Sequence, residues 1–94
     1  MKRIEIIFSQ AIDEDVILAL KPIPEAQFFT LIPSVRGQGY TTPKMGDAVW
    51  PEENEIIIIY CMNDDAADRI ETAIKKLQGK YTAEGLAIFI MESR

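Results

Sequence analysis

Residues 56–62 form the longest strongly apolar run in the chain, and they read Ile-Ile-Ile-Ile-Tyr-Cys-Met. A short run rich in β-branched side chains predicts a strand. Because successive side chains of a strand point to opposite faces, four consecutive isoleucines give this strand two apolar faces. The run is also far shorter than the roughly 20 apolar residues that a membrane-spanning helix needs. We therefore expect a sheet with both faces covered, in a protein that does not insert into a membrane.

Three further segments supply the neighbours of this strand. The first has alternating apolar side chains at Ile4, Ile6 and Phe8, as expected of a strand with one buried face. The second is rich in β-branched and aromatic residues and contains Pro33, which predicts an edge strand or a bulge. The predicted strands cover residues 2–9, 28–35, 56–62 and 86–91.

Two helices lie between these strands. The first is predicted from about residue 13 to 21, and we interpret its acidic residues 13–15 as capping and solvated groups. The second begins after a cap at Asn63 or Asp64 and ends at Gly79. The order β-α-β-β-α-β predicts a single α+β domain over residues 1–94 with the ferredoxin-like arrangement. In that arrangement, two helices cover one face of a four-stranded antiparallel sheet.

The second face of such a sheet has no helix over it. The strands at 56–62 and 86–91 nevertheless carry apolar side chains on both faces, so an isolated subunit would expose a large apolar patch. Self-association with closed symmetry would cover this face most simply. Another protein covering it is the alternative.

The composition excludes several kinds of function. The chain has 10 Lys and Arg residues against 15 Asp and Glu residues, so it lacks the basic surface that nucleic acids require. It has no histidine, which removes the commonest general base and metal ligand, and we expect no enzymatic activity and no metal site. Its single cysteine, Cys61, favours a reducing compartment, and we expect a cytoplasmic protein.

The segment from about residue 36 to 54 is the predicted loop between the second and third strands. Residues 36–47 contain three glycines and one proline, and loops of this length are often functional. At its start, residues 35–40 read Val-Arg-Gly-Gln-Gly-Tyr. Gly37 and Gly39 would allow backbone N–H groups to approach an anion closely. Alternatively, these glycines only begin the loop, with positive φ angles.

This motif resembles the start of the T-loop in the nitrogen regulatory PII family and its PII-like relatives. The opening residues 1–7 and the segment 54–77 are also similar to that family, as are Gly79-Lys80 and Glu84-Gly85, which resemble its B-loop. The resemblance implies a homotrimer that signals by binding ATP, ADP or AMP in clefts between subunits. It implies a transporter or enzyme as the target of the loop. It implies ligand-binding roles for Arg36, Gly37, Gln38, Gly39, Lys80 and Gly85, and a partner-binding role for Tyr40, Lys44 and Met45. Trp50 is a further candidate for partner binding because exposed tryptophan often anchors an interface, and packing in the core or within the loop is the alternative.

Two departures from the family pattern concern the phosphates of a nucleotide. Ala87 stands where the family has a lysine before its Ile-Phe pair, and residues 51–55 read Pro-Glu-Glu-Asn-Glu where a second lysine is expected. We interpret Glu52, Glu53 and Glu55 as a solvated charge run that would repel a triphosphate. The sequence therefore favours a weaker or smaller anionic ligand.

A related trimeric protein for metal tolerance or heavy-metal efflux is the alternative function. Cys61 and Met62, with Met45 and Met91, are soft ligands that would suit Cu(I). However, Cys61 and Met62 are adjacent in a strand and point to opposite faces, so ordinary core packing explains them better.

Overall fold

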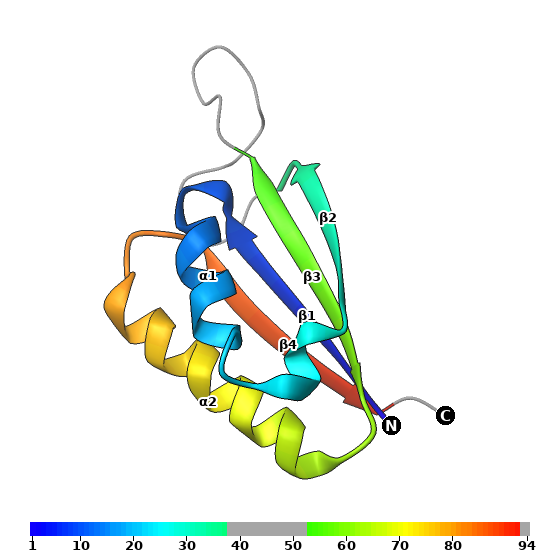
Figure 1. Ribbon diagram of the computed structural model, residues 1–94. Coiled ribbons are helices and arrows are strands. Elements are labelled where there is room, and N and C mark those ends of the chain that lie inside the picture. The colour runs from blue at the N-terminus through cyan, green and yellow to red at the C-terminus, as the bar shows by residue number, and fades with distance from the viewer. Residues whose placement is uncertain (38–52, 93–94) are drawn as a thin grey trace.

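The computed structural model describes residues 1–37 and 53–92, and Figure 1 shows their arrangement. The element order β-α-β-β-α-β is confirmed, and both helices lie on the same face of one sheet. Two short 3-10 turns, η1 and η2, were not predicted from the sequence. The elements are β1 (Lys2–Ser9), η1 (Gln10–Ile12), α1 (Asp13–Leu20), η2 (Pro24–Gln27), β2 (Phe29–Val35), β3 (Asn54–Cys61), α2 (Asp64–Lys80) and β4 (Leu86–Glu92).

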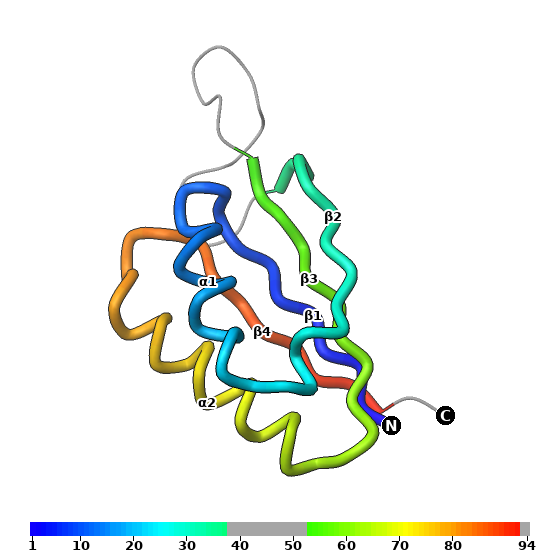
Figure 2. The backbone as a smooth tube through the Cα atoms, viewed as in Figure 1, coloured from blue at the N-terminus to red at the C-terminus, as the bar shows by residue number. Residues whose placement is uncertain are grey.

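The four strands form an antiparallel sheet in the order β2-β3-β1-β4, so β1 and β3 are central. Ile4 of β1 lies opposite Ile59 of β3 and Ile90 of β4, and this register places their side chains on one face. The paths of the strands through the sheet can be followed in Figure 2. The sheet therefore has the strand order of the ferredoxin-like fold, as the sequence predicted.

The core lies between the sheet and the two helices. Ile57 and Ile59 of β3 have no exposed surface, and neither do Ile70 and Ile74 of α2. Fully burying such a side chain stabilises the fold by roughly 1.5–3 kcal/mol. The apolar positions predicted on the inner side of β1 and on α2 are thus confirmed as core positions.

The helix ends differ in detail from the prediction. Asn63 is the N-cap of α2, and its Oδ1 accepts a hydrogen bond of 2.6 Å from the backbone N–H of Ala66. The prediction that Gly79 ends this helix was wrong by one residue, because α2 continues to Lys80. The Tyr81 N–H still bonds to the Leu77 carbonyl, which satisfies the last turn without a left-handed glycine.

Strand β2 is an irregular edge strand, as Pro33 predicted. Its pairing with β3 shifts register between Ile32 and Val35, and Ser34 between them has a φ of 57°. Proline cannot donate a backbone hydrogen bond, so a bulge at an edge is where a sheet tolerates it.

The face of the sheet away from the helices is hereafter called the outer face. Ile58 of β3 is half-buried there, while Phe89 and Met91 of β4 are 50% and 39% exposed. The predicted apolar character of this face is therefore confirmed for β3 and β4. The sequence reasoning missed the ion pair in its middle, where Arg3 Nη2 of β1 lies 2.9 Å from Glu5 Oε2. The Arg3 guanidinium also donates a hydrogen bond to the Tyr60 hydroxyl.

Neither helix in the described part of the chain combines the length and apolar character needed to cross a bilayer.

Candidate functional site

The predicted ligand-binding residues that the structure describes lie at or beside one end of the sheet. This loop end consists of residues 35–37, 53–55, 9–10 and 85–86. Asn54 lies opposite both Val35 of β2 and Ser9 of β1, and the Ser9 N–H donates a 2.9 Å hydrogen bond to the Gly85 carbonyl. Figure 2 shows the ends of these strands along the same end of the sheet.

Arg36 and Gly37 occupy the β2 side of the loop end. The Arg36 side chain is 66% exposed, and its Nε lies 3.8 Å from Glu53 Oε2. The alternative of a positive φ is not supported at Gly37, because its backbone does not adopt one. A Cβ there would lie 3.1 Å from Asn54 Nδ2, so close packing against β3 favours glycine.

Lys80 and Gly85 occupy the β4 side. Lys80 is the last residue of α2, and its exposed ammonium lies 5.3 Å from the centroid of the Tyr81 ring. The Gln78 amide donates a 2.8 Å hydrogen bond to the Leu86 carbonyl, which fixes the end of α2 against the start of β4. The Gly85 carbonyl accepts a hydrogen bond from the Ser9 N–H, which fixes the start of β4 against the end of β1.

These two groups lie at opposite sides of the loop end within a subunit. Arg36 and Gly37 follow the edge strand β2, whereas Lys80 ends α2 and Gly85 precedes the other edge strand, β4, with β3 and β1 between the two edges. Three strand spacings of about 4.8 Å separate such edges by roughly 14 Å. The remaining predicted site residues lie outside the described part of the chain: Gln38, Gly39, Tyr40, Lys44, Met45 and Trp50.

The interpretation of Glu55 as part of a solvated charge run was wrong. Glu55 is only 7% exposed and lies opposite Phe8 on the helix-covered face of the sheet. Burial, with a hydrogen bond to Asp13 and the negative charge of Asp13, raises the pKa of Glu55 to about 7. The alternation of side chains along β3 indicates that Glu55 is buried, because Glu55 lies on the same face as the buried Ile57 and Ile59.

The interpretation of residues 13–15 also needs correction. They form the acidic first turn of α1, as predicted, but the N-cap is Ile12, which makes no side-chain capping bond. Asp15 instead accepts a 2.7 Å hydrogen bond from the Tyr81 hydroxyl, which joins α1 to the turn after α2. This bond raises the pKa of Tyr81.

The metal alternative gains no support from the described residues. Cys61 is buried on the helix-covered face, whereas Met62 is 78% exposed, so the two sulfur atoms do not converge. Within residues 1–37 and 53–92, no group of three or more His, Cys, Asp or Glu side chains could hold a metal ion. Met45 lies outside the described residues.

The geometry defines the chain as a ferredoxin-like α+β domain with a long connection between β2 and β3. Its sequence matches the family model of the nitrogen regulatory protein P-II over residues 1–93. The chain therefore belongs to the P-II family, as its motifs suggested. No individually curated protein matches the sequence.

Solved structures of PII-like proteins share the fold. CPII from Thiomonas intermedia K12, bound to ADP and bicarbonate, is 18% identical, with a TM-score of 0.70 over 96% of this chain and 82% of that one. The structure of CPII bound to ADP, AMP and bicarbonate is 17% identical, with a TM-score of 0.72 over 96% of this chain and 82% of that one. A PII-like signalling protein from Thermus thermophilus is 18% identical, with a TM-score of 0.65 over 96% and 83% of the two chains.

Proposed function

We propose that this protein is a cytoplasmic, trimeric regulatory protein that binds an adenine nucleotide or a similar small anion at clefts between subunits. Family membership supports the regulatory role. CPII, which shares the fold, has been solved with ADP, AMP and bicarbonate. The observation that carries the proposal is the division of the predicted ligand residues between two opposite edges of the sheet.

Self-association explains the outer face. Covering half-buried and exposed side chains such as Ile58, Phe89 and Met91 would remove an apolar patch that a lone subunit leaves in water. Each apolar side chain fully buried adds roughly 1.5–3 kcal/mol, and several copies offset the cost of association. The Arg3–Glu5 pair is already neutral, so covering it would leave no unpaired charge.

Assembly also completes the ligand site. Within one subunit, Arg36 and Gly37 lie on the β2 side of the sheet and Lys80 and Gly85 on the β4 side, with two strands between them. Placing the β2 edge of one subunit beside the β4 edge of another would bring the two groups together. The site then depends on the trimer, and a variant that cannot assemble also loses the ligand.

Among the residues that the structure describes, the site has few cations for a triphosphate. Arg36 lies near Glu53, and Ala87 supplies no charge at the start of β4. We therefore propose ADP or AMP as the ligand in preference to ATP. The target, a transporter or an enzyme, would contact the loop through Tyr40, Lys44, Met45 and Trp50, on the family pattern alone.

Calorimetry with ATP, ADP and AMP, each with and without bicarbonate, tests the nucleotide. We expect ADP or AMP to bind, and both Arg36→Ala and Lys80→Ala to weaken binding about tenfold or more, since each removes a charge-assisted contact worth about 1.5–3 kcal/mol. Lys21→Ala is the matched control, because it removes one exposed positive charge at the far end of α1. The proposal fails if no nucleotide binds, or if all three variants weaken binding equally.

A further inference from the structure

Glu55 is a buried carboxyl group whose nearest charged neighbour has the same sign. It lies on the helix-covered side of β3, opposite Phe8 and two residues before Ile57. Its Oε1 atom is buried and has no hydrogen-bond partner among the described residues. Its neutral, protonated form donates a hydrogen bond to the carboxylate of Asp13 at the start of α1. A carboxyl group in this setting strongly favours the form that carries a proton.

No cation faces this pair from the elements packed around it, within the part of the chain that the structure describes. Phe8 and Ser9 of β1 are uncharged, and α1 contributes only Asp13. Glu84 precedes Gly85, whose carbonyl accepts a hydrogen bond from the Ser9 N–H, so it is a further acidic residue near this end of β1. At the loop end, the Arg36 guanidinium lies against Glu53.

Residues 10–13 and 53–55, which contain the carboxyl pair, are also joined by two hydrogen bonds. The Gln10 N–H donates to the Glu53 carbonyl at 2.9 Å, and the Gln10 side-chain Oε1 accepts from the Glu53 N–H at 3.4 Å. Asp13 follows Gln10 by three residues, and Glu55 follows Glu53 by two. Repulsion between the two carboxylates would therefore act directly across the Gln10–Glu53 connection.

We propose that Glu55 and Asp13 form a proton switch that controls the loop end of the sheet. With one proton between them, the two carboxyl groups bond to each other, and residues 10–13 and 53–55 stay together. When the proton leaves to solvent, the buried Glu55 and the partly buried Asp13 carry negative charges that repel, and the Gln10–Glu53 connection weakens. The position of the pair agrees with a pKa of about 7 for Glu55, within the physiological range.

The switch would also act on the anion site, and this consequence rests on the proposed function. Gly37 lies two residues beyond the end of β2, the strand next to β3, and strand spacing and rise place it about 10 Å from Glu55. One added negative charge at that distance lowers the affinity for an anion about two- to tenfold, depending on the local dielectric. The protein would then bind its anionic ligand more tightly below pH 7 than above it.

Carbon-13 NMR of the Glu side-chain carboxyls in the wild-type protein tests the switch directly. We expect Glu55 to titrate with a midpoint near pH 7, and the backbone amides of Glu53 and Asn54 to shift with the same midpoint. In Glu55→Gln, which keeps the shape and a donor for Asp13, these amide shifts should disappear. Glu53→Gln is the matched control, and its Glu55 midpoint should stay near 7. A Glu55 midpoint below about 5, or amides of residues 53 and 54 that do not follow it, would overturn the proposal.

Calorimetry with ADP at pH 6 and pH 8 tests the consequence. Because the phosphates of ADP also titrate, the informative quantity is the affinity of Glu55→Gln divided by that of the wild type. This ratio should be near one at pH 6 and about two to ten at pH 8. A ratio that does not change with pH would overturn the coupling. If ADP does not bind at all, the proposed function fails, while the carboxyl and amide titrations still decide whether the switch exists.

Discussion

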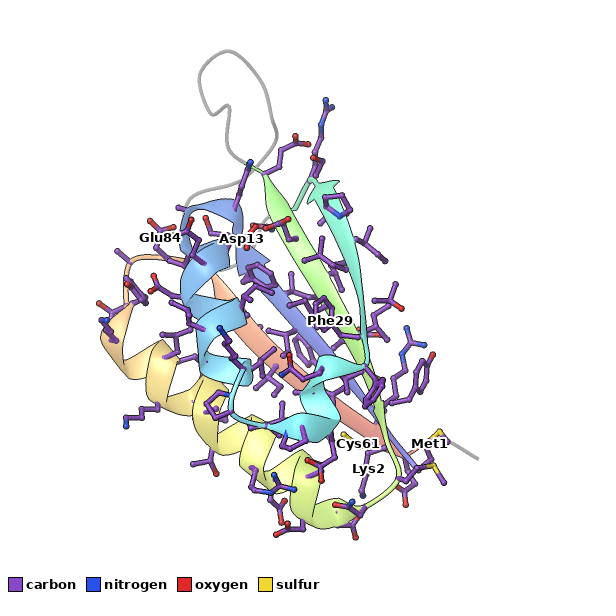
Figure 3. All side chains as sticks on the ribbon, in the orientation of Figure 1. Met1, Lys2, Asp13, Phe29, Cys61 and Glu84 are labelled. Atoms are coloured by element: carbon purple, nitrogen blue, oxygen red, sulfur yellow. The ribbon has the colours of Figure 1, made fainter. Side chains whose placement is uncertain are left out.

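The two faces of the sheet differ in how their charged side chains are paired. The helix-covered face is sealed by α1 and α2, and Glu55, the one buried acidic residue in the described part of the chain, has another carboxyl group as its neighbour. The outer face has no helix over it, and its charges, Arg3 and Glu5, neutralise each other at 2.9 Å. Figure 3 shows how densely side chains fill the space between the sheet and the helices. The Arg3–Glu5 pair brings no net charge into an interface, although its desolvation costs free energy, whereas Glu55, beside a second carboxyl group, favours its protonated form.

The largest effect should come from placing a charge on the outer face. Ile58→Asp introduces an unpaired carboxylate where we propose that subunits meet, and burying an uncompensated charge costs about 3–5 kcal/mol per subunit. We expect sedimentation at micromolar concentration to show a single subunit in place of a trimer. Leu18→Asp is the control, because Leu18 is 60% exposed on α1. If Ile58→Asp keeps the wild-type mass, the outer face is not the subunit interface.

The next largest effect is the loss of stability when neighbouring isoleucines on the two faces of β3 are truncated to alanine. Ile57→Ala should lower the free energy of unfolding by about 2–5 kcal/mol, because Ile57 is fully buried against the helices. Ile58→Ala should cost less in a dissociated subunit, where the side chain is only half-buried. Denaturant unfolding, at a concentration where sedimentation shows single subunits, measures both values. Equal losses at both positions in single subunits would contradict the difference between the faces.

Much of this fold could be predicted because the spacing of apolar residues differs between strands and helices. Alternation in residues 2–9 and the helical spacing in α2 depend only on which side chains avoid water, so the element order and core were found. The two 3-10 turns were missed, since such short turns have no repeating apolar pattern. Gly79 misled the prediction because it lies inside the last turn of α2.

The site was predictable only in part. The glycine motif and Lys80 drew attention to the loop end, but sequence spacing could not show that Gly37 and Gly85 lie on opposite edges. Glu55 was misjudged because its acidic neighbours suggested a solvated run, while its strand parity indicated burial. Its pairing with Asp13 joins residues 42 positions apart, which only the packing of α1 on β3 brings together.

The effect of pH on stability should separate the two faces further. The pKa of Glu55 is raised from its ordinary 4.5 to about 7, so its contribution to stability is complete below pH 4.5 and is lost as the pH rises to about 7. A tenfold change in proton affinity corresponds to about 1.4 kcal/mol, so the loss amounts to about 3 kcal/mol at most. Glu55→Gln should therefore be more stable than wild type at pH 8 and about equally stable at pH 4. Urea unfolding at both pH values measures this difference.

The smallest effect should come from the same substitution on the outer face, and its sign should be opposite. Glu5→Gln removes the partner of Arg3, and because both side chains are partly exposed, a dissociated subunit should lose no more than about 1 kcal/mol. In the assembled protein the loss should grow, since Arg3 would then be covered without its carboxylate. Urea unfolding at pH 8, at concentrations where sedimentation shows single subunits and where it shows the assembly, compares these two states. If Glu5→Gln stabilises the protein as Glu55→Gln does, the pairing of Arg3 with Glu5 does not distinguish the outer face from the covered one.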